Sequence, residues 1–355
     1  MLIKKLSLRN FRNYQSLSFD FTEHLNVLTG NNAVGKTNVV EAIYYLSLGK
    51  SFRTAEDIEL IKKNSDYSQI DAVISEGELI KKIRVVITKE GRTVMINGKN
   101  IARISDLLKC VNVILFQPKD VMLFNGPPKD RRNFLDISIS RKYISYLDCI
   151  SKYDKILKER NDLLKAERVD QTLLDIQTDL LIKISSSIIS YRQRYVKDIN
   201  DILNKITRAL MGDKGKFELH YQPYVKFDDQ FTDNAKKAFK RAEESDFKHK
   251  QTSIGTHRED ISISLNGRDI AAYGSQGENR IAALALKLSP YFLIEDKDKK
   301  PIIVLDDVMS ELDPDNQSRL IDFLRKFNQV FITGTKLNIP DCNHLSIKKQ
   351  TKEVF

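Results

Sequence analysis

The sequence predicts an α/β protein that combines a core sheet, an antiparallel β lobe and an inserted antiparallel helical arm. Three observations support this fold class. Short apolar runs alternate with helical segments at both ends of the chain, residues 68–100 alternate apolar and polar side chains, and residues 131–211 keep a helical spacing of apolar side chains. We therefore expect one domain assembled from both ends of the chain, with the arm inserted between them.

The composition is that of a folded protein. The chain has 355 residues, 41% hydrophobic and 30% charged, which is enough for about two domains and argues against disorder. The net charge of +10 favours polyanionic partners. The mean hydropathy is −0.37, and there is neither a membrane-length apolar run nor an apolar signal segment, so we expect a cytoplasmic protein with no membrane partner. Cys110, Cys149 and Cys342 have no spacing that suggests a disulfide framework or a zinc site.

The N-terminal third reads as strands around one helix. Residues 24–29 form a short β-leaning run that ends at a glycine, and residues 38–48 have the pattern of an amphipathic helix closed by Gly49. Residues 68–100 predict an antiparallel meander, because glycine-containing turns separate its alternating segments.

The middle of the chain reads as two long helices. They are separated by a polar turn near residues 166–171, and we expect them to pack antiparallel, each on the order of 50 Å long. Tyrosines at near-heptad spacing are interpreted as a core seam in preference to base-stacking groups. Beyond the arm, residues 217–224, 260–270, 301–307 and 329–335 read as strands, with a helix that starts near Gly277.

The segment GNNAVGKT fits the phosphate-loop pattern GxxxxGK[ST] between a predicted strand and a predicted helix. Glycines let the loop turn its amide groups inward, so that the helix N-terminus and these N–H groups hold phosphates. A lysine adds a point charge, and a hydroxyl can join a Mg²⁺ shell. The residues expected to contact the nucleotide here are Gly30, Asn31, Asn32, Ala33, Val34, Gly35, Lys36, Thr37 and Asn38.

Two carboxylates follow the apolar run Ile302 to Leu305. Asp306 can support a magnesium ion together with Thr37, and Asp307 can polarise an attacking water. An ordinary buried strand that ends in exposed acidic residues would have the same sequence pattern. The phosphate loop elsewhere in the chain favours the catalytic interpretation, in which Lys36, Asp306 and Asp307 act together.

The stretch Tyr273 to Glu278 combines a serine hydroxyl, glycine-exposed amides and a helix start. With the segment SELDP at residues 310–314, it resembles the signature motif and D-loop of ABC-type ATPases. In that family the signature loop caps the ATP bound by a partner subunit. The resemblance therefore implies a nucleotide-gated homodimer in which Ser275 and Gly277 act in trans.

The order of motifs along the whole chain resembles the RecF family of bacterial recombination mediators, relatives of the SMC ATPases. The matching segments are LSLRNFRNY, GNNAVGKTNVVEAIYYLSLGKSFR, FQPKDVMLFNGPPKDRRNFLD, GTHRED, GSQGENR and LDDVMSELD. This resemblance implies an ABC-type, SMC-head ATPase domain. Its N-terminal part would be residues 1–128, the arm residues 129–212, and the C-terminal part, with the signature motif and the acidic strand, residues 213–355.

The resemblance also implies roles for single residues, with ATP and Mg²⁺ as cofactors. Gln117 occupies a position that senses the γ-phosphate and the metal, although a surface glutamine after a strand is the simpler alternative. Arg12 is expected near the nucleotide. Gln276 stands where many ABC proteins have glycine, and the switch position at the end of residues 329–335 has Thr333 or Thr335 and no histidine. Both departures imply slow turnover, as in a switch.

The function implied by resemblance is an ATP-dependent, DNA-binding recombination mediator with a weak DNA-stimulated ATPase. It would dimerise at gapped double-stranded DNA and, with RecR and RecO, promote RecA loading in replication-linked repair and the SOS response, associating with the nucleoid when bound. A transporter ATPase subunit is disfavoured because an arm separates the ATP motifs, and an SMC-like structural protein because the arm is short. In GTHRED, a structural or phosphate-contacting Arg258 is favoured over a catalytic His257.

Overall fold

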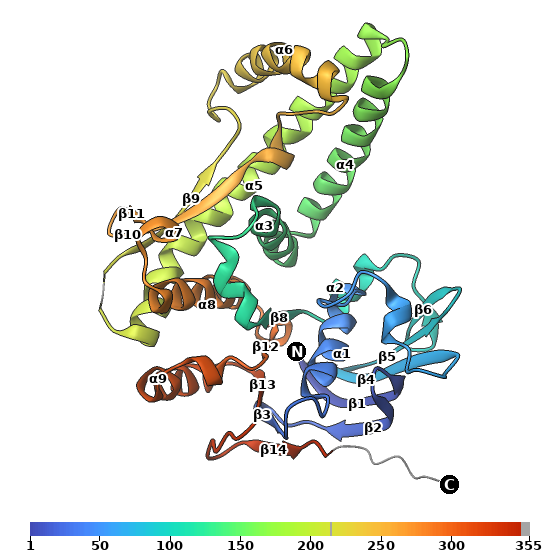
Figure 1. Ribbon diagram of the computed structural model, residues 1–355, viewed down its shortest axis with the longest axis vertical. Coiled ribbons are helices and arrows are strands. Elements are labelled where there is room, and N and C mark those ends of the chain that lie inside the picture. The colour runs from blue at the N-terminus through green and yellow to red at the C-terminus, as the bar shows by residue number, and fades with distance from the viewer. Residues whose placement is uncertain (214, 349–355) are drawn as a thin grey trace. The chain divides into compact units, whose positions relative to one another are not determined.

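The computed structural model describes residues 1–213 and 215–348 (Figure 1). Packing divides these residues into two compact units. The first comprises Met1–Asp120, Ala209–Gly212 and the described residues from Ile294 onward, and the second comprises Val121–Arg208 and the described part of Asp213–Leu293. The predicted domain boundaries at residues 128 and 212 stay a prediction. They divide the chain by the role of each part in an ATPase, whereas the two units described here are divided by packing.

A five-stranded parallel sheet lies in the first unit. Its strand order is β14-β3-β13-β12-β8, and every neighbouring pair is parallel. All residues of β8, β12 and β13 are buried, as expected for strands of a parallel sheet that is covered on both faces. The strands are β3 (His24–Thr29), β8 (Val113–Phe116), β12 (Ile302–Leu305), β13 (Gln329–Gly334) and β14 (Asn343–Ser346).

A six-stranded antiparallel sheet forms the rest of the β structure in this unit. It confirms the predicted meander over residues 68–100 and adds two N-terminal strands to it. Its inner side chains belong to one buried apolar cluster that also includes residues of the parallel sheet. The strands, in the order in which they lie in the sheet, are β2 (Tyr14–Asp20), β1 (Leu2–Phe11), β4 (Tyr67–Glu76), β5 (Leu79–Thr88), β6 (Gly91–Ile96) and β7 (Lys99–Asn100).

Helix α1 (Lys36–Leu48) directly follows the loop after β3, so the predicted strand, glycine loop and helix are confirmed. Its apolar side chains join the buried cluster of the two sheets. Gly49 ends the helix in the left-handed conformation, and its amide donates to the Tyr45 carbonyl at 2.8 Å. The other helical segments of this unit are α2 (Ser105–Cys110), α9 (Pro314–Leu324), η1 (Asp57–Leu60), η4 (Lys297–Lys299) and η5 (Met309–Glu311), and η2 (Pro118–Leu123) runs into the second unit.

The helices of the second unit correct the predicted arm. The first of the two predicted helices is broken at Tyr143, where the backbone is extended, into α3 (Pro128–Lys142) and α4 (Ile144–Lys165). Helix α5 (Gln171–Met211) continues without a break. At 1.5 Å per residue, α4 is about 33 Å long and α5 about 62 Å, in place of the expected pair of about 50 Å.

The antiparallel packing of α4 on α5 is confirmed. Ser145 hydrogen-bonds Tyr191, whereas Glu159, further along α4, accepts from Gln177, which is earlier in α5. The tyrosine seam is also confirmed, because Tyr146, Tyr153 and Tyr195 are buried.

The C-terminal elements of the second unit pack against these helices. A three-stranded antiparallel sheet contains β9 (Phe217–Gln222), β10 (Asp260–Leu265) and β11 (Arg268–Asp269). The buried guanidinium of Arg192 on α5 pairs with Glu259 at 2.7 Å and with Asp136 of α3 at 2.8 Å. The helical segments here are α6 (Phe231–His249), η3 (Thr256–Arg258), α7 (Ile270–Tyr273) and α8 (Gln276–Leu293). No helix in the described parts of the chain is both long and apolar enough to span a membrane.

Candidate functional site

The loop of residues 30–35 connects β3 to α1 at the carboxyl edge of the parallel sheet, where ligands bind in open α/β folds. Two of its glycines cannot be replaced without strain. Gly35 has φ 113°, and a Cβ there would lie 2.5 Å from the Tyr14 hydroxyl. A Cβ on Gly30 would lie 2.5 Å from the carbonyl oxygen of Ile347. The loop is therefore closely packed on its inner side.

The outer side of the loop is open. Asn31, Asn32 and Ala33 are exposed, whereas Val34 is buried and its carbonyl accepts a hydrogen bond from Asn13 at 2.9 Å. The loop is thus held from the β1–β2 turn and presents its tip to solvent.

Lys36, the first residue of α1, folds back over the loop. Its Nζ donates to the carbonyl oxygens of Gly30 at 2.7 Å and Asn31 at 2.9 Å, and the residue is only 8% exposed. Among the described residues, no carboxylate pairs with this ammonium group. Its positive charge is therefore available to a phosphate that replaces the two carbonyl groups.

Thr37 and Asp306 join the two sequence motifs in space. The Thr37 hydroxyl donates to Asp306 Oδ1 at 3.2 Å, although 269 residues separate them. The Thr333 hydroxyl, from β13, donates to the same oxygen at 2.7 Å. Burial raises the pKa of Asp306, and the hydrogen bonds from the two threonines oppose this rise.

The residues around Asp306 fit a magnesium ion. The group contains a buried carboxylate and a hydroxyl, which are oxygen donors of the type that Mg²⁺ takes from proteins. No cation forms an ion pair with Asp306 within the described ranges, so a bound divalent ion would stabilise a carboxylate that burial otherwise destabilises.

Asp307 differs from its neighbour in both exposure and backbone. Asp306 is 6% exposed, whereas Asp307 is exposed and has φ 55°, a left-handed conformation that is uncommon for residues other than glycine. The Asp307 amide donates to the Thr333 hydroxyl at 2.9 Å. The two adjacent carboxylates thus have different environments and can take different roles.

Gln117 lies at the same edge of the sheet. It follows β8, whose Phe116 carbonyl accepts from the Asp306 amide at 2.9 Å. The Gln117 amide donates to the Asp120 carboxylate at 2.8 Å, which fixes the backbone here. The sheet thus places Gln117 beside Asp306, and its role near a metal stays a prediction.

Arg12 is held by a carboxylate that the sequence interpretation missed. Glu41 of α1 is fully buried and accepts from Arg12 Nε at 2.9 Å and from Nη2 at 2.6 Å. Arg53 lies 3.4 Å from Glu41 and donates to Asn38 Oδ1 at 2.7 Å. The positive charge of Arg53 also lowers the pKa of Asp306, less than the hydrogen bonds from Thr333 and Thr37 do. The sequence signal for this cluster was Glu41 itself, a charged residue within the otherwise apolar residues 39–46.

The signature residues belong to the second unit, whereas the phosphate loop and Asp306 belong to the first. Ser275 caps α8: its amide and hydroxyl donate to Glu278 Oε2 at 2.8 and 2.9 Å, and the Glu278 amide donates to the Ser275 hydroxyl at 3.3 Å. Ser275 and Gly277 are exposed, and a Cβ on Gly277 would meet no atom within 4 Å. Both are open to an approaching molecule.

His257 is engaged within the second unit. Its Nε2 contacts the Thr252 carbonyl at 3.1 Å, so this nitrogen has the hydrogen, and Nδ1 accepts from the Tyr153 hydroxyl at 2.8 Å. Burial lowers the pKa of His257 to about 4. A neutral, doubly hydrogen-bonded ring supports the structural interpretation of GTHRED.

The chain is similar to known proteins over nearly its full length. A family model described as the RecF/RecN/SMC N terminal domain matches residues 2–346. A protein of Halalkalibacterium halodurans named DNA replication and repair protein RecF is 35% identical over 360 residues, covering 99% of this chain and 96% of that protein. A protein of the same name from Clostridium novyi is 37% identical over 339 residues, covering 95% and 94%.

Solved structures agree with these matches. The recombination mediator protein RecF with ATP, from the RecFOR pathway, superimposes with a TM-score of 0.89 at 31% identity, covering 98% of this chain and 96% of that one. The Smc head of Pyrococcus furiosus bound to the C-terminal domain of ScpA gives a TM-score of 0.56 at 19% identity, covering 94% and 89%, and supports the fold alone. The predicted α/β head of the ABC and SMC type is confirmed.

Proposed function

The chain belongs to the RecF/RecN/SMC family, and we propose that it is an ATP-gated, DNA-binding recombination mediator. One observation carries this proposal: the Thr37 hydroxyl and the Asp306 carboxylate meet at 3.2 Å across the edge of the parallel sheet. That contact assembles a phosphate loop and an acidic strand end from opposite ends of the chain, which is the arrangement that ATP hydrolysis requires.

In this proposal ATP binds over the phosphate loop. Lys36 exchanges its two carbonyl partners for phosphate oxygens, and the amides at the start of α1 face the same phosphates. Thr37 and Asp306 hold Mg²⁺, with Gln117 beside them. When bound, Mg²⁺ supplies positive charge that neutralises the phosphates and the charge that develops on them during transfer.

Asp307 is proposed to polarise the attacking water. It is exposed, lies next to the metal-binding carboxylate, and has its backbone fixed by the hydrogen bond to Thr333. Thr333 therefore couples the two acids, because its hydroxyl donates to Asp306 and accepts from the Asp307 amide. The switch position has a threonine, Thr333 or Thr335, and no histidine, which supports slow, switch-like turnover.

The exposed signature residues are proposed to complete the site of a second subunit. Ser275 and Gly277 stand at the N-terminus of α8, where the helix dipole favours an anion. A γ-phosphate bound to one subunit is the anion that this terminus fits in the other. ATP would then hold a homodimer together, and hydrolysis would release it.

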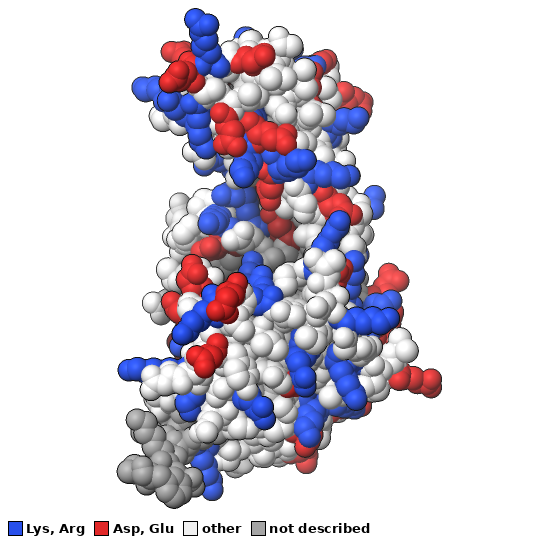
Figure 2. Space-filling view, turned by 90° about the vertical axis from the view of Figure 1, so that its right-hand side faces the viewer, with Lys and Arg blue, Asp and Glu red and all other residues white. Residues whose placement is uncertain are grey.

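The dimer is proposed to bind double-stranded DNA next to single-strand gaps. Basic side chains are spread over the face in Figure 2 with acidic ones among them, so the excess of ten positive charges is not gathered in one block of that view. We propose contacts from Lys and Arg side chains to the DNA backbone without base recognition, because the net charge favours a polyanion, with affinity that falls steeply as salt rises.

The ATP-bound structural neighbour belongs to the RecFOR pathway, which supports RecR and RecO as partners of this chain. RecA loading is proposed as the outcome on the family resemblance alone. Relatives named for DNA replication and repair support a role in replication-linked repair, and action at gaps and in the SOS response is proposed on the family resemblance alone.

Sedimentation velocity with ATP and Mg²⁺, with ADP and Mg²⁺, and without nucleotide tests the proposal. We expect a dimer only with ATP, because only the γ-phosphate completes the contacts of the partner's signature loop. The same sedimentation coefficient under all three conditions would refute ATP gating.

A further inference from the structure

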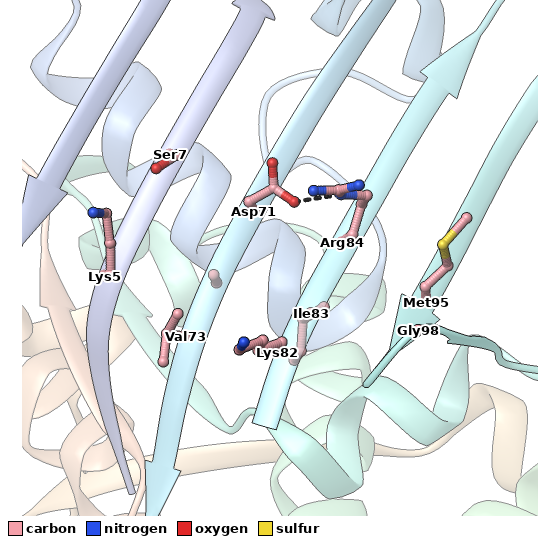
Figure 3. A pocket seen from close by; sticks show the side chains of 10 residues that line it. Lys5, Ser7, Asp71, Val73, Lys82, Ile83, Arg84, Met95 and Gly98 are labelled. Carbon is pink, nitrogen blue, oxygen red and sulfur yellow. Dashed lines mark hydrogen bonds and ion pairs between the residues drawn. The ribbon is translucent and has the colours of Figure 1, made fainter. Parts of the chain in front are cut away.

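A hollow of about 340 Å³ lies on the outer face of the six-stranded sheet, the face turned away from the buried cluster (Figure 3). All of its walls belong to the first unit, and none is a residue of the ATP site. We call it the lobe hollow; the side chains that define it are Lys5, Asp71, Val73, Lys82, Arg84 and Met95.

The strand register sets the pattern of charge across the lobe hollow. Lys5 on β1 is paired with Val73 on β4, and Val73 is paired with Lys82 on β5. Neighbouring strands are about 4.8 Å apart, so the two lysines flank the valine at a Cα separation of about 10 Å. Figure 3 shows Lys5 and Lys82 on either side of Val73.

Positive charge is in excess around the lobe hollow. Lys82 is exposed, and its ammonium group has no ion-pair partner among the residues that the structure describes. Lys5 has only a distant exposed partner, Asp20, at 3.9 Å. Arg84 donates through Nε to Asp71 at 2.6 Å, and with a side chain 55% exposed it presents the rest of its guanidinium to solvent.

The floor of the lobe hollow is apolar. Val73 lies between the two lysines, and Ile80, two residues before Lys82 on the same face of β5, is 52% exposed. Met95, which is paired with Arg84, lines the hollow on the far side of β5. An apolar floor between two cations is complementary to a chain that has an apolar side chain between carboxylates.

We propose that the lobe hollow docks an acidic peptide segment of a partner protein. One apolar side chain of that segment packs on Val73, and carboxylates on either side of it pair with Lys5 and Lys82. Duplex DNA fits less well, because the Asp71 carboxylate lies within the surface that phosphates would have to cover and the floor offers phosphates no donor.

Fluorescence anisotropy with labelled synthetic peptides tests the docking. The probe carries one Phe between runs of Asp and Glu; one control peptide has Ser for Phe, and the other has Asn and Gln for the acids. We expect the full-length protein to bind the probe about tenfold more tightly than either control, because both the floor and the cations contribute.

Variants locate the binding. Lys5→Glu combined with Lys82→Glu should weaken probe binding at least about tenfold, since two attractions become repulsions. Val73→Glu should weaken it independently by placing a carboxylate in the floor. Lys89→Glu, a matched reversal seven residues beyond Lys82, should leave the affinity unchanged. All four positions are at least partly exposed, and thermal melts check that each variant folds.

Two results would overturn the proposal. One is equal affinity of the double variant and the parent for the acidic probe. The other is a double variant that binds a labelled DNA duplex more weakly than the parent but binds the acidic probe equally well. That result would make the lobe hollow a nucleic-acid surface. Neither result depends on ATP, so this test is separate from that of the proposed ATPase.

Discussion

The carboxylate of Glu41 accepts two hydrogen bonds from the Arg12 guanidinium, 2.9 Å from Nε and 2.6 Å from Nη2. Glu41 is fully buried at the middle of α1, whereas Arg12 comes from the turn that supports the phosphate loop. The pair therefore ties the β1–β2 turn to the helix that begins with the nucleotide-binding lysine.

Glu41→Gln should lower the free energy of unfolding by about 2 to 4 kcal/mol, because a neutral amide leaves the Arg12 guanidinium without its buried counter-charge. Urea denaturation measures the change. Glu59→Gln is the matched control: that carboxylate is 4.0 Å from Arg12 and 57% exposed, so the expected loss is below about 1 kcal/mol. Equal losses in the two variants would contradict the special role of Glu41.

Lys36→Ala should abolish ATP binding, since the loop would lose the ammonium group that lies across it. Lys36→Arg should retain binding but reduce turnover about tenfold or more, because a planar guanidinium places its charge differently from an ammonium group. Isothermal titration with ATP measures binding, and a steady-state phosphate-release assay measures turnover. Parent-like ATP affinity in Lys36→Ala would mean that the loop does not hold the phosphates.

Ser275→Arg should leave ATP binding by the monomer intact while blocking dimer formation and hydrolysis, because the long cation would occupy the space of the partner's nucleotide. Ser275→Ala is the control that removes the helix cap without adding a bulky side chain. It should lose about 1 kcal/mol of helix stabilisation but should still dimerise with ATP. Nucleotide titration and sedimentation measure both properties. Weakened ATP binding by the Ser275→Arg monomer would argue against action in trans.

His257 predicts a pH-dependent stability. Its pKa is about 4 in the folded chain and about 6.5 when unfolded, so the unfolded state binds more protons between these values. Stability should fall as pH drops from about 6.5 to about 4, by at most about 3 kcal/mol from this residue. His257→Gln should flatten that part of the pH profile in urea denaturation. Parallel profiles for the two proteins would show that the ring titrates normally.

Local patterns predicted the phosphate loop well. The glycines, the lysine and helix α1 are consecutive in sequence, and each follows from backbone preference and periodicity. The meeting of Thr37 with Asp306 was also predictable, because both follow strands whose carboxyl ends share one sheet edge.

Long-range contacts explain what the sequence interpretation missed. The pairing of Glu41 with Arg12 depends on the β1–β2 turn folding back over α1, and the hydrogen bonds of Thr333 depend on β13 lying beside β12. The break at Tyr143 was missed because apolar spacing continues through it, so periodicity alone gives one helix. A local sequence pattern predicts neither which strands are neighbours in the sheet nor the helix break at Tyr143.

The dissociation rate of the protein from gapped DNA, measured with ATP for the parent and for Asp307→Asn, tests the central claim that hydrolysis opens a DNA-bound dimer. The substitution keeps Asp306 and Thr37 for the metal but removes the carboxylate that polarises water, so turnover should fall about 100-fold. The account predicts that DNA residence lengthens in step with the loss of turnover. Slow turnover with an unchanged dissociation rate would contradict the gating mechanism.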